Sequence, residues 1–295
     1  EVFALPGERL AVVVTDRISV FDYVIGTIPF KGQVLNRLAN WWLRKLDDIS
    51  IPHHFLSEPH PNVSIVRRAA ALPVEIVVRG YLTGTTRTSS WYAYQHLDRV
   101  ICGITMPAGM RKNEPFEKPI ITPSTKPTEG HDENISRAEI LRRALMTPAV
   151  LETAEDYALR LFAHGQRLAA ARGLILADTK YEMGLTADGL IVIDEVHTPD
   201  SSRYWIAGTY AERLAAGQEP ESLDKEFVRR MIVENGYDIT SQAHPKDFLT
   251  DAIRREASRR YLSLFEVITG ETIAPQPTRV EEIVAVLDAA QCAIA

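Results

Sequence analysis

The segment 174–205 (LILADTKYEMGLTADGLIVIDEVHTPDSSRYW) constrains the fold of this chain more than any other. Two apolar runs, 174–177 and 190–193, flank a polar stretch that contains Ala-Asp-Gly at 187–189. Asp-Gly between two apolar runs is the strongest short-range signal for a β-hairpin. The sequence therefore predicts two paired strands here, with charged side chains spaced along the first of them.

The charged residues of this hairpin are predicted to share one face. Side chains alternate along a strand, so Asp178, Lys180 and Glu182 lie on the same side. A turn centred on Asp188 places Glu182 directly opposite Asp194, and a one-residue slip would put these two acids on opposite faces. Carboxylates facing each other across paired strands have Cβ atoms about 5 Å apart and repel each other. A hard cation such as magnesium with a phosphate ligand removes that conflict, so a metal site is predicted at the two acids.

Polar residues continue beyond the second apolar run, over 194–203 (DEVHTPDSSR). Binding groups often gather on loops that follow buried strands. Within this run, Arg203 has the planar fork that grips a phosphate or a carboxylate with two hydrogen bonds. His197 by itself is predicted to be a structural histidine rather than a base. The competing interpretation of the whole segment is a surface hairpin in which Lys180 simply neutralises its acidic neighbours.

Composition narrows the class of protein. The chain has 295 residues, 45% of them hydrophobic and 24% charged, which is ordinary for a globular protein with a large core. Its formal net charge of −6 disfavours general nucleic-acid binding, so an anionic ligand needs a local cluster of Arg and Lys. Two distant cysteines, at 102 and 292, make neither a disulfide framework nor a metal-ligand spacing. Since no apolar run is long enough to span a membrane and no signal peptide is visible, we expect a cytoplasmic protein.

Two lobes of unequal size are expected in an α+β fold. Residues 1–71 are predicted to form a small β-rich lobe, and 72–295 a larger α+β lobe that ends in helices. Pro73, just before the strand 74–79, marks the expected hinge between them. The first residues resemble the second half of a strand and no initiator Met is present, so we expect further residues before Glu1.

Helices are predicted where apolar residues recur at helical spacing and where capping residues or glycines mark an end. These segments are 34–46, a helix capped by Ser136, 153–172 ending at Gly173, 253–268 ending at Gly270, and a last helix capped by Thr278. The segment 107–127 contains five prolines, which predicts an irregular loop. A long loop of this kind is a candidate lid over a site.

Other segments combine flexible backbone with groups that bind anions. The loop 79–86 has two glycines and three threonines after a strand, and its amides, hydroxyls and Arg79 can hold a phosphate. It lacks the spacing of a Walker A loop or a dinucleotide fingerprint, so an ordinary turn is the alternative. Three further polar regions can bind anions or serve the structure alone. The structural alternative is an ion pair for 15–22, a helix entry for 122–126 with 130–136, and a charged helix face for 223–230.

Taken together, these segments closely resemble the SAICAR synthetase family (phosphoribosylaminoimidazole-succinocarboxamide synthase) of purine biosynthesis. Each segment alone is weak, but eight in the family's order are highly specific. The matching segments are 15–22 (TDRISVFD), 28–42 (IPFKGQVLNRLANWW), 72–85 (LPVEIVVRGYLTGT), 122–126 (TPSTK), 131–136 (HDENIS), 177–184 (ADTKYEMG), 194–205 (DEVHTPDSSRYW) and 222–229 (SLDKEFVR). One departure is that the family's Gly-Lys-containing strand over the ATP phosphates is missing before Glu1.

The resemblance implies a ligase that uses ATP and magnesium to join L-aspartate to the carboxylate of carboxyaminoimidazole ribotide. It also implies a two-lobed fold related to ATP-grasp and kinase-like lobes, small-molecule partners, and a monomer or small homo-oligomer. The implied site residues are Lys180 and Asp178 for catalysis; Glu182 and Asp194 for the metal; Glu75, Lys180, Glu182 and Asp194 for the nucleotide; Arg79, Thr85 and Arg203 for the ribotide phosphate; Asp16, Arg17, Lys31, Ser124 and Lys126 for the aspartate and carboxylate end; and Lys225 and Arg229 for further anions.

The chemistry of this reaction accounts for these residue types. A carboxylate is a poor acyl donor, and transfer of the ATP γ-phosphoryl group turns it into an acyl phosphate with a good leaving group. Positioning and charge neutralisation do most of this work, which suits magnesium and Lys180. The aspartate amine must then attack unprotonated, with Asp178 or the substrate itself as the candidate base. Two alternatives stay open: a kinase-like phosphotransferase that stops at phosphorylation, and a nucleotide-binding protein without catalysis.

Overall fold

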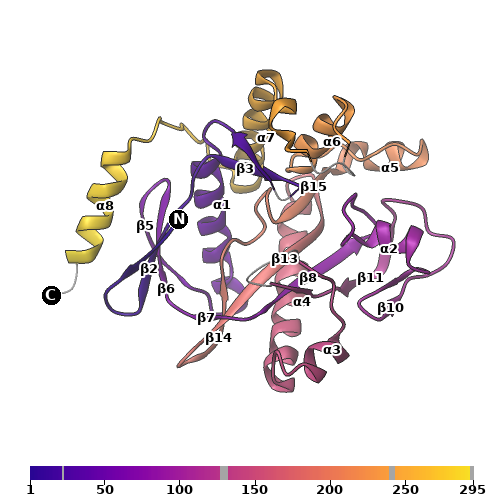
Figure 1. Ribbon diagram of the computed structural model, residues 1–295, viewed down its shortest axis with the longest axis horizontal. Helices are drawn as coiled ribbons and strands as arrows, with labels where there is room; N and C mark the ends of the chain where they lie inside the picture. The colour runs from indigo at the N-terminus through magenta and orange to yellow at the C-terminus, as the bar shows by residue number, and fades with distance from the viewer. Residues whose placement is uncertain (22, 127–131, 239–242, 293–295) are drawn as a thin grey trace.

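The computed structural model describes most of the chain, namely residues 1–21, 23–126, 132–238 and 243–292 (Figure 1). Asp22 and His131 of the motifs above, and Pro127 at the end of the proline-rich segment, lie outside the described residues. Within those ranges the chain is a mixed α+β protein, which confirms the predicted fold class. None of the helices that these residues form has the length and apolar character that a membrane span requires.

A four-stranded antiparallel sheet forms from the first part of the chain, with the strand order β1-β2-β6-β5. Its strands are β1 (Val2–Leu5), β2 (Arg9–Val13), β5 (Phe55–His60) and β6 (Val63–Arg67). The first residues form a strand, as predicted, and Gly7 in the β1–β2 turn takes a φ of 74°, which glycine adopts at no steric cost. A separate hairpin consists of β3 (Arg17–Val20) and β4 (Tyr23–Thr27).

A larger sheet is built around one long strand, β13 (Leu174–Thr186). The main strands have the order β11-β8-β13-β14, with β7, β12 and β15 paired to them. Because neighbours hydrogen-bond to both edges of β13, the alternation of its side chains is fixed. The remaining strands are β7 (Ala70–Ala71), β8 (Val74–Tyr81), β11 (Pro115–Ile121), β12 (Ser124–Thr125), β14 (Gly189–Ile193) and β15 (Ser202–Ile206), with a small hairpin of β9 (Val100–Ile101) and β10 (Ile104–Thr105).

The predicted β13–β14 hairpin forms, but its register differs from the prediction by one residue. Glu182 pairs with Ile193 rather than with Asp194, because residues 187 and 188 alone form the turn. Two-residue turns are favoured in hairpins since their twist matches that of the strands. The predicted turn centred on Asp188 is therefore wrong, and so is the direct pairing of the two acids.

The proline-rich segment is more regular than predicted. Residues 115–121 form β11, which pairs with β8 at the edge of the larger sheet. Proline is tolerated in an edge strand because the open edge needs no backbone N–H donor. The register of β11 shifts between Pro115 and Ile120, the interval that contains Pro119. The prediction of an irregular loop is wrong for this stretch, while a role as a lid stays a prediction.

Eight α-helices and two 3₁₀ turns are formed by the described residues. They are α1 (Lys31–Lys45), η1 (Asp47–Ile49), α2 (Ser90–His96), α3 (Arg137–Arg142), α4 (Pro148–Ala170), α5 (Ala207–Ala215), α6 (Glu226–Glu234), η2 (Pro245–Phe248), α7 (Asp251–Thr269) and α8 (Val280–Cys292). Ser136 caps α3 and Gly270 ends α7, as predicted. The start of α4 lies earlier than predicted, because the Thr147 side chain caps it and Pro148 suits a first turn. The capping role predicted for Thr278 is wrong, since its hydroxyl donates to an asparagine side chain in the β5–β6 turn.

The main core lies between the larger sheet, α1 and α4 (Figure 1). Trp42 of α1 is fully buried and packs edge-on against His197, with ring centroids 4.6 Å apart. This confirms the structural role predicted for His197. In Figure 1, α7 lies against α1, and α8, in yellow, lies beside the first sheet and covers its apolar face.

Gly165→Ala should destabilise the protein. Gly165 lies where α4 meets His197, and a Cβ at this position would be 2.3 Å from the imidazole ring. The ring would have to move against Trp42, so we expect the free energy of unfolding to fall by about 1–3 kcal/mol. Urea denaturation measures this change.

Gly208→Ala in α5 is the matched control. In the described part of the chain, no atom outside the immediate neighbours lies within 4 Å of a Cβ there. The substitution should be neutral or stabilise the helix by up to about 1 kcal/mol. Equal free energies of unfolding for the two variants would contradict the proposed packing at Gly165.

Candidate functional site

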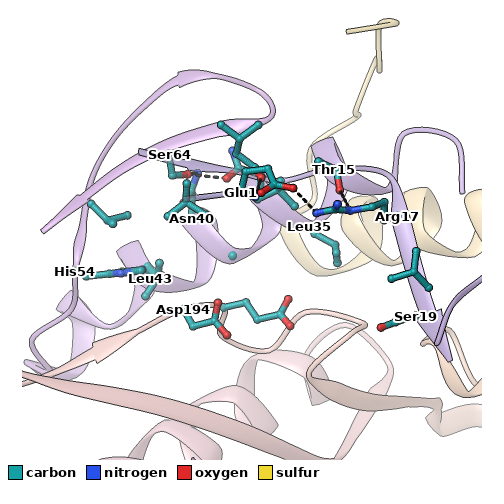
Figure 2. A pocket seen from close by; sticks show the side chains of 18 residues that line it. Glu1, Thr15, Arg17, Ser19, Leu35, Asn40, Leu43, His54, Ser64 and Asp194 are labelled. Atoms are coloured by element: carbon teal, nitrogen blue, oxygen red, sulfur yellow. Dashed lines mark hydrogen bonds and ion pairs between the residues drawn. The ribbon is translucent and has the colours of Figure 1, made fainter. Parts of the chain in front are cut away.

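Two cavities are lined by residues predicted for the site, and β13 itself lines only one of them. The large cavity, of about 560 Å³, lies between the first sheet and α1 and ends at Asp194 and Glu195. Figure 2 shows its walls, with Asn40 and Ser64 on one side and Asp194 on the other. The polar cavity, of about 210 Å³, is lined by β8, β13, the loop after β14 and α6. Its ten charged residues balance, the basic ones being Arg79, Lys180, Arg203, Lys225 and Arg229 and the acidic ones Glu75, Asp178, Asp200, Asp224 and Glu226.

Lys180 links the acids on the β13 face. Its ammonium group lies 2.8 Å from Glu182 Oε1 and 3.2 Å from Glu75 Oε2, and the other oxygen of Glu182 contacts Lys126. Burial acts in the opposite direction, yet the two lysines lower the pKa of Glu182 to about 2. Burial raises the pKa of Glu75, although Lys180 opposes that rise. Four residues predicted from the sequence thus meet in one ion-pair network.

Asp194 reaches this network through its backbone conformation rather than through strand pairing. It follows β14 with a left-handed φ of 60°, an uncommon conformation that aspartate tolerates better than most residues. Its carboxyl group is within hydrogen-bonding reach of Glu182. Desolvation in the cavity, followed by the carboxylates of Glu195 and Glu182, raises the pKa of Asp194 to about 7. Because Asp194 is open to solvent inside the cavity, water screens part of this repulsion.

Asp178 joins the two strands that flank the first half of β13. It pairs across the sheet with Arg79 of β8 and with Arg203 of β15. Its Oδ2 atom lies 2.5 Å from Arg203 Nη1 and 3.5 Å from Arg79 Nη1. Although burial disfavours the charge, Asp178 raises the pKa of Arg203. Both guanidinium groups are therefore fixed in the wall of the polar cavity.

Glu226 was not predicted, and it occupies groups that were predicted to hold a phosphate. Its carboxylate accepts a hydrogen bond from Thr85 Oγ1 at 2.9 Å and lies 3.1 Å from Arg229 Nη1 and 3.8 Å from Arg203 Nη2. Despite burial, the two arginines lower the pKa of Glu226 to about 2. Among the described residues, Arg203 Nε and Arg229 Nε have no hydrogen-bond partner. The signal for Glu226 in the sequence was its position three residues before Arg229 on a helix, where the two side chains can pair.

Asp200 is the second acid that sequence reasoning missed as a site residue. Its Oδ2 atom lies 2.9 Å from Lys31 Nζ and 3.4 Å from Lys225 Nζ, and its Oδ1 atom accepts a hydrogen bond from Tyr261 Oη at 2.6 Å. The three partners come from the start of α1, the start of α6 and the middle of α7. No local pattern connects such distant segments, so only the fold brings the two predicted lysines together.

Two predicted substrate-binding residues have other partners, and the side chain of a third has none among the described residues. Asp16 accepts hydrogen bonds from two backbone N–H groups at the start of α1, at 2.8 and 3.2 Å. Arg17 is exposed beside the large cavity and pairs with Glu1 at 2.8 Å. Ser124 lies in β12 against β8, and its buried Oγ has no partner within the described ranges. The roles predicted for these three residues stay predictions.

Glu182 and Asp194 fit a magnesium ion. Two neighbouring carboxylates, one of which raises the pKa of the other, gain from a divalent cation between them. Magnesium usually binds one or two carboxylates and takes its other ligands from phosphates and water. The described residues contain no group of three or more His, Cys, Asp or Glu that could hold a metal. A site built from these two acids therefore requires a phosphate-bearing ligand.

The two cavities bring many of the predicted site residues together, and comparisons with known proteins identify the family of this mixed α+β chain. The SAICAR synthetase family model matches residues 1–245. The phosphoribosylaminoimidazole-succinocarboxamide synthase of Legionella pneumophila (strain Lens) is 46% identical over 267 residues, which are 90% of this chain and 84% of its own. The same enzyme of Bacteroides thetaiotaomicron is 46% identical over 281 residues, 94% of this chain and 87% of its own. The chain belongs to the SAICAR synthetase family, and the ATP-dependent aspartate ligase predicted from the sequence is confirmed.

Solved structures agree with this assignment. SAICAR synthase from Saccharomyces cerevisiae in complex with SAICAR superposes with a TM-score of 0.76 at 28% identity, over 93% of each chain. A SAICAR synthetase in complex with ADP superposes with a TM-score of 0.70 at 22% identity, over 93% of this chain and 96% of its own. At 22% identity, the likeness to the ADP complex shows only that the two proteins share a fold.

Glu182→Gln should destabilise the protein at every pH in the working range. The substitution removes a carboxylate that pairs with two lysines, so we expect a loss of about 1–3 kcal/mol in the free energy of unfolding. The pKa of Glu182 in the folded state is about 2, below its ordinary value of 4.5. Its stabilising effect is thus complete above pH 4.5 and is lost only as the pH falls toward 2. Urea denaturation should show the loss at both pH 5 and pH 8, and it should be smaller at pH 8, where removing Glu182 also relieves its repulsion of ionised Asp194.

Asp194→Asn should stabilise the metal-free protein, in contrast to Glu182→Gln. The pKa of Asp194 is raised from 3.8 to about 7, so the folded state loses stability as the pH rises between these values. Removing the acid should therefore stabilise the metal-free protein more at pH 8 than at pH 5. A variant that is less stable than the parent protein at pH 8 would contradict the crowding of acids described above.

Proposed function

We propose that this protein joins L-aspartate to the carboxylate of carboxyaminoimidazole ribotide, with conversion of ATP to ADP and phosphate. Membership of the family supports this overall reaction. The observation that carries our assignment of residues is the series Lys180–Glu182–Asp194, which connects the two cavities. Lys180 lines the polar cavity and Asp194 the large one, so a phosphoryl group can pass between ligands that occupy both.

The large cavity is our proposed site for ATP. Apolar residues of β2, β6 and α1 line one part of it, and Asp194 and Glu195 lie at another. An apolar wall suits a purine base, and acids suit the magnesium ion that accompanies the phosphates. The volume of about 560 Å³ is in the range of pockets that enclose a small molecule. Glu75 and Glu182 complete the nucleotide-binding set that the sequence predicts.

The polar cavity is our proposed site for the ribotide and aspartate. Arg203 and Arg229 each have an unused Nε donor, and Thr85 lies beside them. A ribotide phosphate would take over the hydrogen bond and ion pairs that Glu226 now makes. Acidic and basic residues balance in this cavity, so its cations already have carboxylate partners. An incoming anion would therefore replace one of those carboxylates as the partner of a cation.

The residues of β13 support the activation of the ribotide carboxylate. Transfer of the γ-phosphoryl group to that carboxylate gives an acyl phosphate; the aspartate amine then attacks the carbonyl and phosphate leaves. Lys180 is placed to neutralise the charge that spreads over the transferred group. Asp178 is engaged by Arg203 and Arg79, which supports a role in holding those arginines. The substrate itself is then the better acceptor for the amine proton.

Further features of the protein belong to the same proposal. Magnesium, held by Glu182 and Asp194, would supply charge neutralisation at the phosphates. Residues 1–71 and 72–295 are proposed as two lobes related to those of ATP-grasp and kinase-like proteins, with 107–127 as a lid that excludes water from the acyl phosphate. We also propose a cytoplasmic protein that acts as a monomer or small homo-oligomer.

Formation of ADP with each substrate omitted in turn tests the reaction. We expect ADP only when ATP, magnesium, the ribotide and aspartate are all present, together with an equal amount of the succinocarboxamide product. A coupled assay for ADP and chromatography of the product measure both. ADP formation from ATP and ribotide without aspartate, with a stable phosphorylated ribotide, would replace the ligase with a phosphotransferase.

Arg203→Lys tests the proposed phosphate grip. Lysine keeps the charge but loses the planar fork, so the KM for the ribotide should rise about tenfold, with a smaller change in the KM for ATP. Arg259→Lys is the control, because Arg259 lies on the exposed surface and pairs only with Glu256 among the described residues. An unchanged ribotide KM in Arg203→Lys would remove this residue from the phosphate site.

A further inference from the structure

The helix α7 contacts the site although the match to the family model ends before it. That match covers residues 1–245, whereas α7 spans Asp251–Thr269. Ser258 donates a hydrogen bond at 2.8 Å to a backbone carbonyl just before α1, and Arg260 donates to one in the segment before α6. Tyr261 donates to Asp200 in the loop after β14. One helix thus holds three separate segments that carry predicted site residues.

Tyr261 has the most direct connection to charged groups of the site. Its side chain is only 1% exposed, and its hydroxyl lies 2.6 Å from Asp200 Oδ1. The other oxygen, Oδ2, lies between Lys31 Nζ and Lys225 Nζ at 2.9 and 3.4 Å. Both oxygens of the carboxylate are therefore used, so it cannot rotate without losing a partner.

This arrangement fixes the positions of two ammonium groups. Lys31 and Lys225 share the single carboxylate of Asp200. Lys225 lines the polar cavity, whereas Lys31 is almost fully buried behind it. A lysine side chain alone is flexible, and an ion pair with an oriented carboxylate restricts where its ammonium group can lie.

We propose that Tyr261 is a positioning residue of the ligase site: through Asp200, which also pairs with the buried Lys31, it holds Lys225 where it meets an anionic substrate. The phenol does not touch the substrate. It acts through the carboxylate that lies between the two lysines. This inference rests on the function proposed above, because it assumes that an anion occupies the polar cavity.

Tyr261→Phe is the direct test. The phenylalanine ring keeps the packing and the contact with Lys31, whose ammonium lies 5.9 Å from the ring centroid, and only the hydroxyl is lost. We expect the KM for the ribotide or for aspartate to rise about tenfold while kcat changes by less than about threefold. A ring that served only to fill the core would leave both constants unchanged, and that result would overturn the proposal.

Tyr237→Phe is the matched control. Tyr237 is also buried and donates its hydroxyl at 3.0 Å to the carbonyl of Ala243, and neither residue lines the two cavities. We expect wild-type kinetic constants and a melting temperature close to that of Tyr261→Phe. An equal rise in KM for both variants would show a general loss of stability and would overturn the proposed positioning role.

A double-mutant cycle with Asp200→Ala tests whether Tyr261 acts through Asp200, because alanine leaves no acceptor for the Tyr261 hydroxyl. If Tyr261 acts through Asp200, adding Tyr261→Phe to Asp200→Ala changes KM no further. A further rise in KM in the double variant would overturn the proposal. Lys225→Met is the alternative background if Asp200→Ala does not fold.

The wild-type assay separates failure of this inference from failure of the proposed function. A wild-type protein that forms product, beside a Tyr261→Phe variant with wild-type constants, overturns the inference alone. A wild-type protein that forms no ADP with all substrates present overturns the proposed function. Calorimetric titration with carboxyaminoimidazole ribotide then tests the inference without turnover, with weaker binding to Tyr261→Phe as the expected result and equal binding as the contrary one.

Discussion

The charge balance around Lys180 is the interaction on which the rest of the site depends. Its ammonium group lies between Glu75 of β8 and Glu182 of β13, two acids that would otherwise repel each other across the sheet. Removing one member of a buried ion pair leaves an uncompensated charge, which costs far more than the pair contributes. The lysine therefore holds the acids in place and at the same time offers a cation to the polar cavity.

The same balance explains which residues of the candidate site could be predicted from the sequence. An anionic substrate calls for cations, so Arg79, Arg203, Lys225 and Arg229 could be selected from their motifs. The acidic partners of these cations could not be selected in this way. They are present because the protein itself must neutralise a cluster of cations when the ligand is absent. Asp200 and Glu226 perform that task, and they were visible only as members of polar runs. A search for cations that could bind an anionic ligand therefore finds the basic residues of such a site and misses the acids that neutralise them.

Local patterns predicted the elements of the fold better than their pairing. Capping residues and terminal glycines identified α3 and the end of α7, because those signals act within one turn of the chain. The register of β13 against β14 and the existence of β11 depend on tertiary contacts, which a period-two pattern does not contain. The family resemblance supplied the site residues, but the link from Tyr261 to Asp200 joins segments 61 positions apart and had no local signal.

The convergence of Glu182 and Asp194 depends on a backbone conformation rather than on the strand register that predicted it. In the observed register the two acids are not paired, and a continued strand at 194 would carry its carboxyl group away from Glu182. The left-handed φ of 60° at Asp194 turns the chain instead, and the side chain of His54 hydrogen-bonds to the backbone at this position. Aspartate is one of few residues that adopt this conformation readily. The residue at 194 is thus constrained twice, by the chemistry of its carboxyl group and by the shape of its backbone, so substitution there with a β-branched residue would remove the acid and the turn together.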